Sequence, residues 1–238
     1  MKWLYRKNLE KSTEISSPQV SPVTPLRNLF DTRLSNLVRF STSGSTIDIH
    51  ILMPGQLEIN AIGIGGHSFG ENTTLVVNGH GPYPVEQVHA FVETEEFAAQ
   101  SIDITITDPS IIPGVPIYIG RLELGLSYEF PGISVNVKVD EVSNSNAIIS
   151  ASRQAYGYRK ATFTRASVQF PLIERDQMDQ MIAAFKYVDI FTPFFVTFDE
   201  ECVIGNTNYG ILEDTKTLAF QMNEAQVFSS SLVISEVN

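Results

Sequence analysis

The chain has 238 residues, 43% of them hydrophobic, and a mean hydropathy of +0.02, so it can bury a sizeable core and does not have the composition of a disordered protein. Its formal net charge of −11 repels phosphate backbones, which argues against nucleic-acid binding. No apolar run approaches the roughly 20 residues that span a bilayer, so we expect no membrane insertion.

The first 25 residues carry few core signals and contain three pairs of Ser or Thr with Pro, which is typical of an extended arm. We therefore predict an arm over residues 1–25. It is either a disordered tail or a segment that docks on a neighbour through Trp3, Leu4 and Tyr5. Its start is basic but lacks the apolar stretch of a secretory signal, so we expect the chain to fold in the cytoplasm of the cell that makes it.

Residues 26–116 show the period-two alternation of strands that bury one face. It is clearest at 47–51 and 102–106, where Ile alternates with polar residues, and further strands are expected at 57–61, 75–77 and 85–92. Turn signals separate them at Pro54-Gly55, Gly65-Gly66, Asn78-Gly79, Gly81-Pro82 and Asp108-Pro109. This pattern predicts a jelly-roll-like β-sandwich.

A second β-rich domain is predicted over residues 117–238, after a proline-rich join at 109–116. One amphipathic helix is expected at about 174–186, because Met178, Met181, Ile182 and Phe185 recur at helical spacing and acidic residues precede them. We interpret this stripe as core packing on a sheet. Strands are expected at 117–124, 135–139, 161–170, 194–198 and 227–234. The fold class is therefore mainly β.

Patterns of catalytic residues are absent from the sequence. The glycine-rich stretch at 63–70 has neither the Gly-Lys-Ser/Thr ending of a phosphate-binding loop nor a following helix, so it is expected to be a tight loop. The four His lack metal-ligand spacing. The single Cys202 is more consistent with a buried side chain than with a nucleophile, because Glu200 and Glu201 disfavour a thiolate. We expect no enzyme activity, no cofactor and no metal.

One acidic residue and one basic cluster each have two interpretations. Asp31 is either a turn or capping residue, or a ligand for Ca²⁺ or a sugar hydroxyl in an early loop of the sandwich. A partial basic cluster is either a solvated strand face or an edge that forms salt bridges between subunits. Its members are Arg153, Arg159, Lys160 and Arg165.

Two parts of the chain resemble certain bacteriophage tail structural proteins. Residues 26–33, 47–51, 59–67 and 74–79 are similar to an N-terminal module of the discoidin, or galactose-binding, type. The second part is similar to a tail domain of these proteins at Gly120-Arg121-Leu122, Ser152-Arg153, 158–163, 194–199 and 232–236. Gln154-Ala155 stand where the tail pattern has paired glycines.

The resemblance implies a non-enzymatic structural component of a phage virion, in the tail, tail tip or baseplate, made in the host cytoplasm. It implies a homo-oligomer, such as a ring, that contacts other tail proteins. Inter-subunit contacts are then expected at Trp3, Tyr5, Arg153 and Arg159. The alternative is a receptor-recognition module that binds host surface glycan through the sandwich. Its candidate glycan or ion contacts are Asp31, His67, Asn72 and Tyr83.

Overall fold

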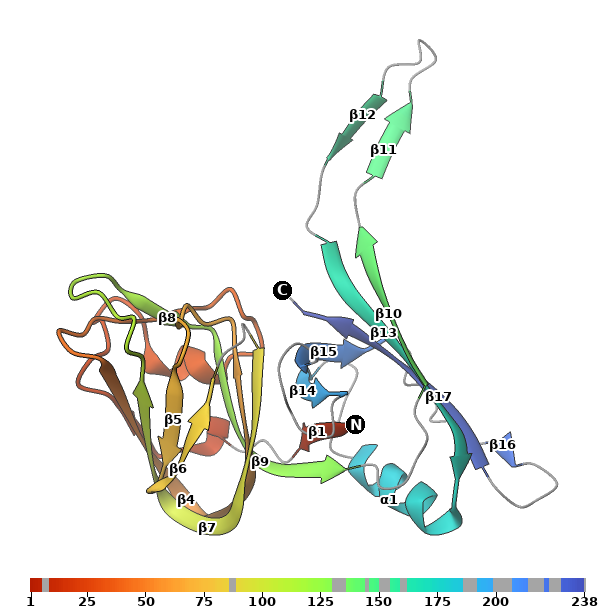
Figure 1. Cartoon of the computed structure of the whole chain (residues 1–238), viewed down its shortest axis with the longest axis horizontal. Coiled ribbons are helices and arrows are strands. Elements are labelled where there is room, and N and C mark those ends of the chain that lie inside the picture. Colours follow the sequence, from red (N-terminus) through yellow and green to blue (C-terminus); the bar gives the residue numbers. More distant parts are fainter. Residues whose placement is uncertain are drawn as a thin grey trace.

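The computed structural model describes residues 1–5, 9–85, 89–129, 136–143, 146–149, 155–158, 162–185, 192–198, 207–213, 221–222 and 228–237. Over these residues the chain is mainly β, with antiparallel strands and one α-helix, α1 (Arg175–Phe185) (Figure 1). The predicted fold class and the predicted helix are thereby confirmed. None of the described helices has the length and apolar character that crossing a membrane requires.

The elements fall into two groups along the chain. The first comprises β1 (Lys2–Tyr5), η1 (Leu9–Lys11), β2 (Glu14–Ser16), η2 (Leu26–Phe30), β3 (Val38–Phe40), β4 (Thr46–Gly65), β5 (Thr74–Val77), β6 (His80–Pro84), β7 (His89–Thr107), β8 (Ile117–Ile119) and β9 (Arg121–Glu129). The second comprises β10 (Asn136–Ser143), β11 (Asn146–Ile149), β12 (Ala155–Tyr158), β13 (Thr162–Ile173), α1, β14 (Phe194–Thr197), β15 (Thr207–Leu212), β16 (Gln221–Met222) and β17 (Phe228–Glu236).

The sandwich is built on β4 and β7, two long strands that pair with each other twice. Residues 46–52 pair with 101–107, and residues 57–65 pair with 89–99, with register shifts in between. The first stretch is flanked by β2 and β5, and the second by β9. Both strands curve, so that their two halves lie in facing layers (Figure 1).

One predicted turn inside this pair is wrong. Pro54-Gly55 was expected to separate two strands, but β4 runs through it, and the register shift against β7 falls between Leu52 and Leu57. Pro has no N–H to give to the ladder, and an irregularity in the pairing accommodates that lack without ending the strand. Gly81-Pro82, also predicted as a turn, lies within β6. The Asn78-Gly79 turn is confirmed, because both residues have a positive φ between β5 and β6.

The hydrophobic residues at every second position of the strands form the core of the sandwich. The isoleucines at 47, 49, 51, 102, 104 and 106 are all buried in one cluster, as their spacing predicts. Leu122 and Leu124 of β9 belong to the same cluster, with Ile117 and Ile119 of β8. The core of the sandwich therefore extends past the predicted domain boundary at residue 116, and the domain limits themselves stay a prediction.

A second core lies under the sheet that runs β10-β13-β17-β15-β14-β1-β9. It contains Ala166, Val168 and Phe170 of β13, which confirms the predicted alternation there, and Met181 of α1. Met178 packs against the same core, whereas Ile182 is 38% exposed, so the helix buries a narrower stripe than predicted. The side chain of Phe185 lies outside the description.

Strand β9 connects the two cores. Its first half, 121–125, pairs with β4 of the sandwich, and its second half, 126–129, pairs with β1. Strand β1 in turn pairs with β14. The first residues of the chain are thus a central strand of the second sheet, and the sheet runs without a break from one core to the other.

Candidate interaction surfaces

Asp31 lies directly after η2 and is engaged locally. Its carboxylate accepts bonds from the backbone N–H of Arg33 at 3.0 Å, from the Arg33 guanidinium, and from the Asn36 amide at 2.7 Å. These hydrogen bonds, with that of the Arg33 side chain the strongest, hold the pKa of Asp31 well below its ordinary value. The geometry is that of a turn residue with both oxygens occupied.

The other candidate glycan contacts lie on two elements. His67 and Asn72 belong to the loop after β4, and Tyr83 lies on β6. The ring of His67 stacks on Phe69 with centroids 4.5 Å apart, and the Phe69 N–H donates to His67 Nδ1. His67 and Phe69 therefore form one aromatic pair, partly exposed at the rim of the sandwich.

Buried Asp108 holds this loop in place. It accepts hydrogen bonds from the N–H of Gly70 at 3.0 Å and from the N–H and hydroxyl of Ser110 at 2.8 and 2.6 Å. Burial alone would raise the pKa of Asp108, but these bonds lower it on balance. A Cβ on Gly70 would overlap Ser110, so the loop needs glycine there. The aromatic pair is thus carried on a rigid loop.

The predicted inter-subunit residues have different positions. Trp3 is fully buried within its own chain, edge-on to Phe194 with ring centroids 5.6 Å apart. Tyr5 ends β1 opposite Leu126. Arg153 and Arg159, like Lys160 and Cys202, lie outside the described residues. Any surface that Trp3 was expected to offer a neighbour is therefore occupied by the chain's own core.

The two cores meet across the second half of β4. Ala61 of β4 and Phe91 of β7 cluster with Leu4, Phe195 and Tyr209 from the strands of the second sheet. The Tyr209 hydroxyl donates to the carbonyl of Thr32 at 3.3 Å. We call this contact the junction. It is apolar at its centre.

Charged residues border the junction. Arg121 and Glu123 are each 1% exposed and are joined by a 2.9 Å bond from Arg121 Nε, while Arg121 Nη1 is buried with no hydrogen-bond partner among the described residues. At another border, His89 Nε2 lies 3.7 Å from a Glu236 oxygen. Among the described residues, no three His, Cys, Asp or Glu side chains gather in a way that could hold a metal ion.

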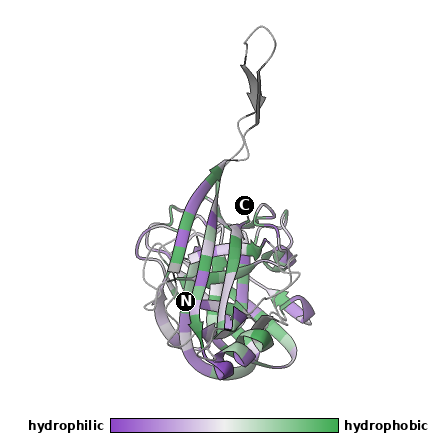
Figure 2. Ribbon diagram, turned by 90° about the vertical axis from the view of Figure 1, so that its right-hand side faces the viewer, coloured by the Kyte–Doolittle hydropathy of each residue, from purple (hydrophilic) through white to green (hydrophobic). Residues whose placement is uncertain are grey.

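A two-stranded ribbon lies beyond the rest of the molecule. Strands β11 and β12 pair only with each other in the described part of the chain, and they lie past the ends of β10 and β13, away from both cores (Figure 1). Figure 2 shows, in a perpendicular view, hydrophobic and hydrophilic residues alternating along the strands of the second sheet. Ser143 and Thr162, the last cross-strand pair of β10 and β13, mark where the ribbon leaves the sheet.

Strand β10 ends the order of the second sheet, with β13 as its neighbour. Val137 lies opposite Val168, and Val139 opposite Ala166, so both valines share the face of the buried core. They are nevertheless 36% and 55% exposed. Within the described residues, this edge offers unpaired backbone groups beside an uncovered apolar strip.

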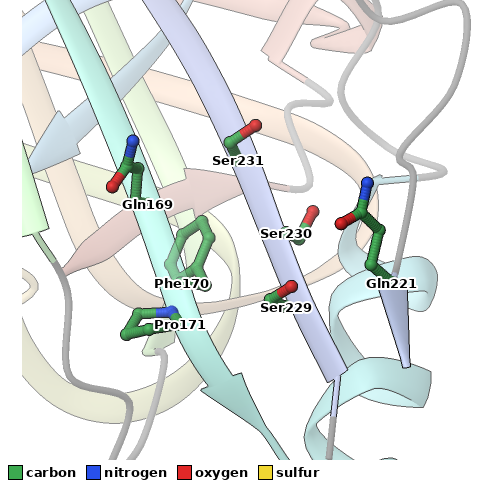
Figure 3. A pocket seen from close by; sticks show the side chains of 7 residues that line it. All are labelled: Gln169, Phe170, Pro171, Gln221, Ser229, Ser230 and Ser231. Carbon is green, nitrogen blue, oxygen red and sulfur yellow. The ribbon is translucent and has the colours of Figure 1, made fainter. Parts of the chain in front are cut away.

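A polar hollow of about 300 Å³ lies on the second sheet, where β17 is flanked by β13 and β16 (Figure 3). The described residues that line it carry no formal charge. They are Gln169, Phe170, Pro171, Gln221, Ser229, Ser230 and Ser231. We call it the β17 hollow.

Comparison with known proteins gives structural likenesses and no family. No family model and no curated protein matches the chain. A fucose-binding module of Streptococcus pneumoniae is similar at 11% identity and a TM-score of 0.36, over 51% of this chain and 99% of the module. A second S. pneumoniae fucose-binding module is similar at 10% identity and 0.36, over 50% and 95%.

A further likeness is to a Ruminococcus gnavus GH29 fucosidase in complex with fucose, at 17% identity and a TM-score of 0.40. It covers 51% of this chain and 27% of the fucosidase. Since all three TM-scores are below 0.5, these likenesses carry no inference about the ligand of this chain.

Sequence reasoning missed the junction and the β17 hollow for the same reason. Arg121 and Glu123 are two residues apart on a strand, so the sequence places them on its polar face, which is ordinarily exposed to solvent. The neighbouring residues give no sign that a second sheet covers this face. Gln169, Ser229 and Ser231 also read as an ordinary solvated face. They come together because β17 pairs with β16, which is close to it in the chain, and with β13, which is more than 50 residues away.

Proposed function

We propose that this protein is a non-enzymatic assembly subunit, and that the ribbon β11–β12 with edge strand β10 is the part that contacts a neighbouring copy. The observation that carries the proposal is a ribbon of two strands with no other sheet partner among the described residues. An isolated two-stranded hairpin is at best marginally stable in water. A partner surface would supply the missing contacts.

Charge supports a second copy of this chain as that partner. Residues 144–161, which span the ribbon, contain Arg153, Arg159 and Lys160 and no acidic residue. Taking these three positive charges away from the net −11 leaves −14 on the rest of the chain. The positive charge of residues 144–161 is opposite to the net charge of the rest of the chain in another copy, and such complementarity favours association.

The edge of β10 supports the same mode of contact. An open strand edge accepts a further strand, and Val137 and Val139 would be covered by it. Symmetric contacts of this head-to-tail kind close into rings. From the sequence resemblance to phage tail proteins, we infer that the assembly is part of a virion tail and that other tail proteins are further partners.

Removal of the ribbon tests the proposal. Because Ser143 and Thr162 are cross-strand partners, residues 144–161 can be replaced by an Asn-Gly turn that closes the β10–β13 hairpin. We expect the wild-type chain to be a multimer by light scattering and the shortened chain to be a monomer with an unchanged melting temperature.

A pair of point variants sharpens the test. Val139→Lys on edge strand β10 should weaken the multimer, whereas Val23→Lys, at a loop residue that is 80% exposed, should leave its mass unchanged. The proposal is wrong if the wild-type chain is a monomer, or if the shortened chain keeps the wild-type mass.

Glycan recognition by the sandwich is the second candidate function. The observation in its favour is the His67–Phe69 aromatic pair on the loop that Asp108 holds rigid, since aromatic rings on a preorganised loop suit the apolar face of a sugar. A glycan array with the full chain tests it. Binding that is lost in Phe69→Ala would support this candidate, and an array without signal would remove it.

A further inference from the structure

We propose that the β17 hollow binds a neutral mono- or disaccharide, at a site separate from both the sandwich loops and the ribbon. This inference goes beyond the proposed assembly function, which does not need a ligand. It rests on the register of three strands, the chemistry of the side chains they bring together, and the volume of the hollow.

Strand register puts four hydrogen-bonding side chains on one face. Gln169 lies opposite Ser231, and Gln221 lies opposite Ser229. Directly opposed residues lie on the same face of a sheet, and so do residues two apart along one strand. Because Ser229 and Ser231 are two apart on β17, all four side chains lie on one face. Phe170, next to Gln169, is fully buried in the core on the other side. Figure 3 shows the four side chains around the same hollow.

The chemistry of this face matches a sugar. Each Gln amide offers two donors and an acceptor, and each Ser hydroxyl offers one donor and accepts as well. Sugar hydroxyls also donate and accept, so they can pair with either group. Within the described part of the chain, none of the four side chains makes a hydrogen bond, so their capacity is available to a ligand.

Charge and size narrow the ligand class. A net charge of −11 disfavours an anionic ligand, and none of the described residues that line the hollow has a charge to hold an ionic one. Neutral groups also lose less than charged ones when a ligand displaces their water. A volume of about 300 Å³ is at the lower end for small-ligand sites. This favours one or two sugar rings over a longer chain.

The test uses the full chain and a panel of methyl glycosides of glucose, galactose, fucose and N-acetylglucosamine, with glucuronate as the anionic member. Saturation-transfer NMR should detect at least one neutral glycoside with a Kd of ~1 mM, and glucuronate should give no transfer. In an amide spectrum, the side-chain signals of Gln169 and Gln221 should shift on titration with that glycoside.

Substitutions locate the binding. Gln169→Ala and Gln221→Ala should each raise the Kd ~3- to 10-fold. Ser167→Ala, on the same face of β13 but outside the hollow, should leave it unchanged, with melting temperatures equal in all three variants. The inference is overturned if no neutral glycoside binds, if binding survives both Gln substitutions, or if Phe69→Ala alone abolishes it and so moves the sugar to the sandwich.

Discussion

The ring of Phe195, on β14 of the second sheet, lies against the backbone of Gly63, in the middle of β4 of the sandwich. A Cβ built on Gly63 would overlap the Phe195 ring, and one on Gly65 would come within 3.1 Å of its tip. Cross-strand pairing puts Phe91 and Glu123 on either side of Gly63. The glycines thus form a trough between larger side chains, into which the aromatic ring fits.

Filling this trough should loosen the junction. We expect Gly63→Ala to lower the free energy of unfolding by about 2–3 kcal/mol, because a packed ring has no room to move away from an added methyl group. Urea denaturation measures the change. Gly55→Ala is the matched control on the same strand, where a Cβ meets nothing within 4 Å, and it should alter the free energy by less than about 0.5 kcal/mol. Equal effects of the two substitutions would contradict this packing.

The buried pair of Arg121 and Glu123 should behave asymmetrically in mutagenesis. Glu123→Leu leaves the guanidinium buried, and among the described residues its remaining ion-pair partner is the more distant Glu10, at 3.8 Å. The variant should destabilise the fold by about 3–5 kcal/mol. The double variant Arg121→Met/Glu123→Leu should recover most of this loss, because no uncompensated charge remains. Thermal denaturation of both variants checks the prediction, and a double variant as unstable as the single one would refute it.

The sequence predicts those features of the fold that depend on residues close together in the chain, and it misses those that depend on distant contacts. The Ile alternation at 47–51 and 102–106 and the Met spacing of α1 report the period of their own element, so strands and helix are predictable. The burial of Trp3 depends on β9 and β14, which are more than 100 residues away along the chain. Seen alone, a short N-terminal segment before a Pro-rich stretch resembles a free arm.

The candidate surfaces were harder to predict than the fold. His67 is a candidate contact from the sequence alone, but the role of Asp108 in holding its loop needs a contact between residues 38 apart. Arg121 appears in the sequence as part of a Gly-Arg-Leu strand motif with no sign of burial. A charged side chain is ordinarily expected at the surface. Arg121 is buried because the second sheet covers it.

Loss of the Asp108 carboxylate should release the loop that carries the aromatic pair. Asp108→Ala removes the acceptor for three hydrogen bonds and should cost about 2–3 kcal/mol, since bonds to a buried charged group are stronger than average. Hydrogen exchange should speed up at Gly70 and Ser110 first. Asp103→Ala is the control, because its exposed pair with His50 is worth at most about 1 kcal/mol. Unchanged exchange at Gly70 would rule out this anchoring role.

His89 should make the junction sensitive to pH. Burial lowers the pKa of His89 from its ordinary value of 6.5, and the attraction of Glu236 opposes this only in part. The neutral imidazole is therefore the form that the folded chain prefers. Its contribution to stability is complete above pH 6.5 and is lost as the pH falls from there through the lowered pKa, because the unfolded chain takes up the proton first.

The measurement is the free energy of unfolding in urea between pH 8 and pH 5. Wild type should lose stability towards pH 5, and His89→Gln should show a flatter profile, because Gln carries no titrating proton. Asp31 and Asp108 do not contribute to the change in stability between pH 8 and pH 5, since their pKa values are lowered from 3.8 and they titrate at more acidic pH. A wild-type profile that is flat between pH 8 and pH 5, or one that His89→Gln leaves unchanged, would show that His89 is not the group that titrates at the junction.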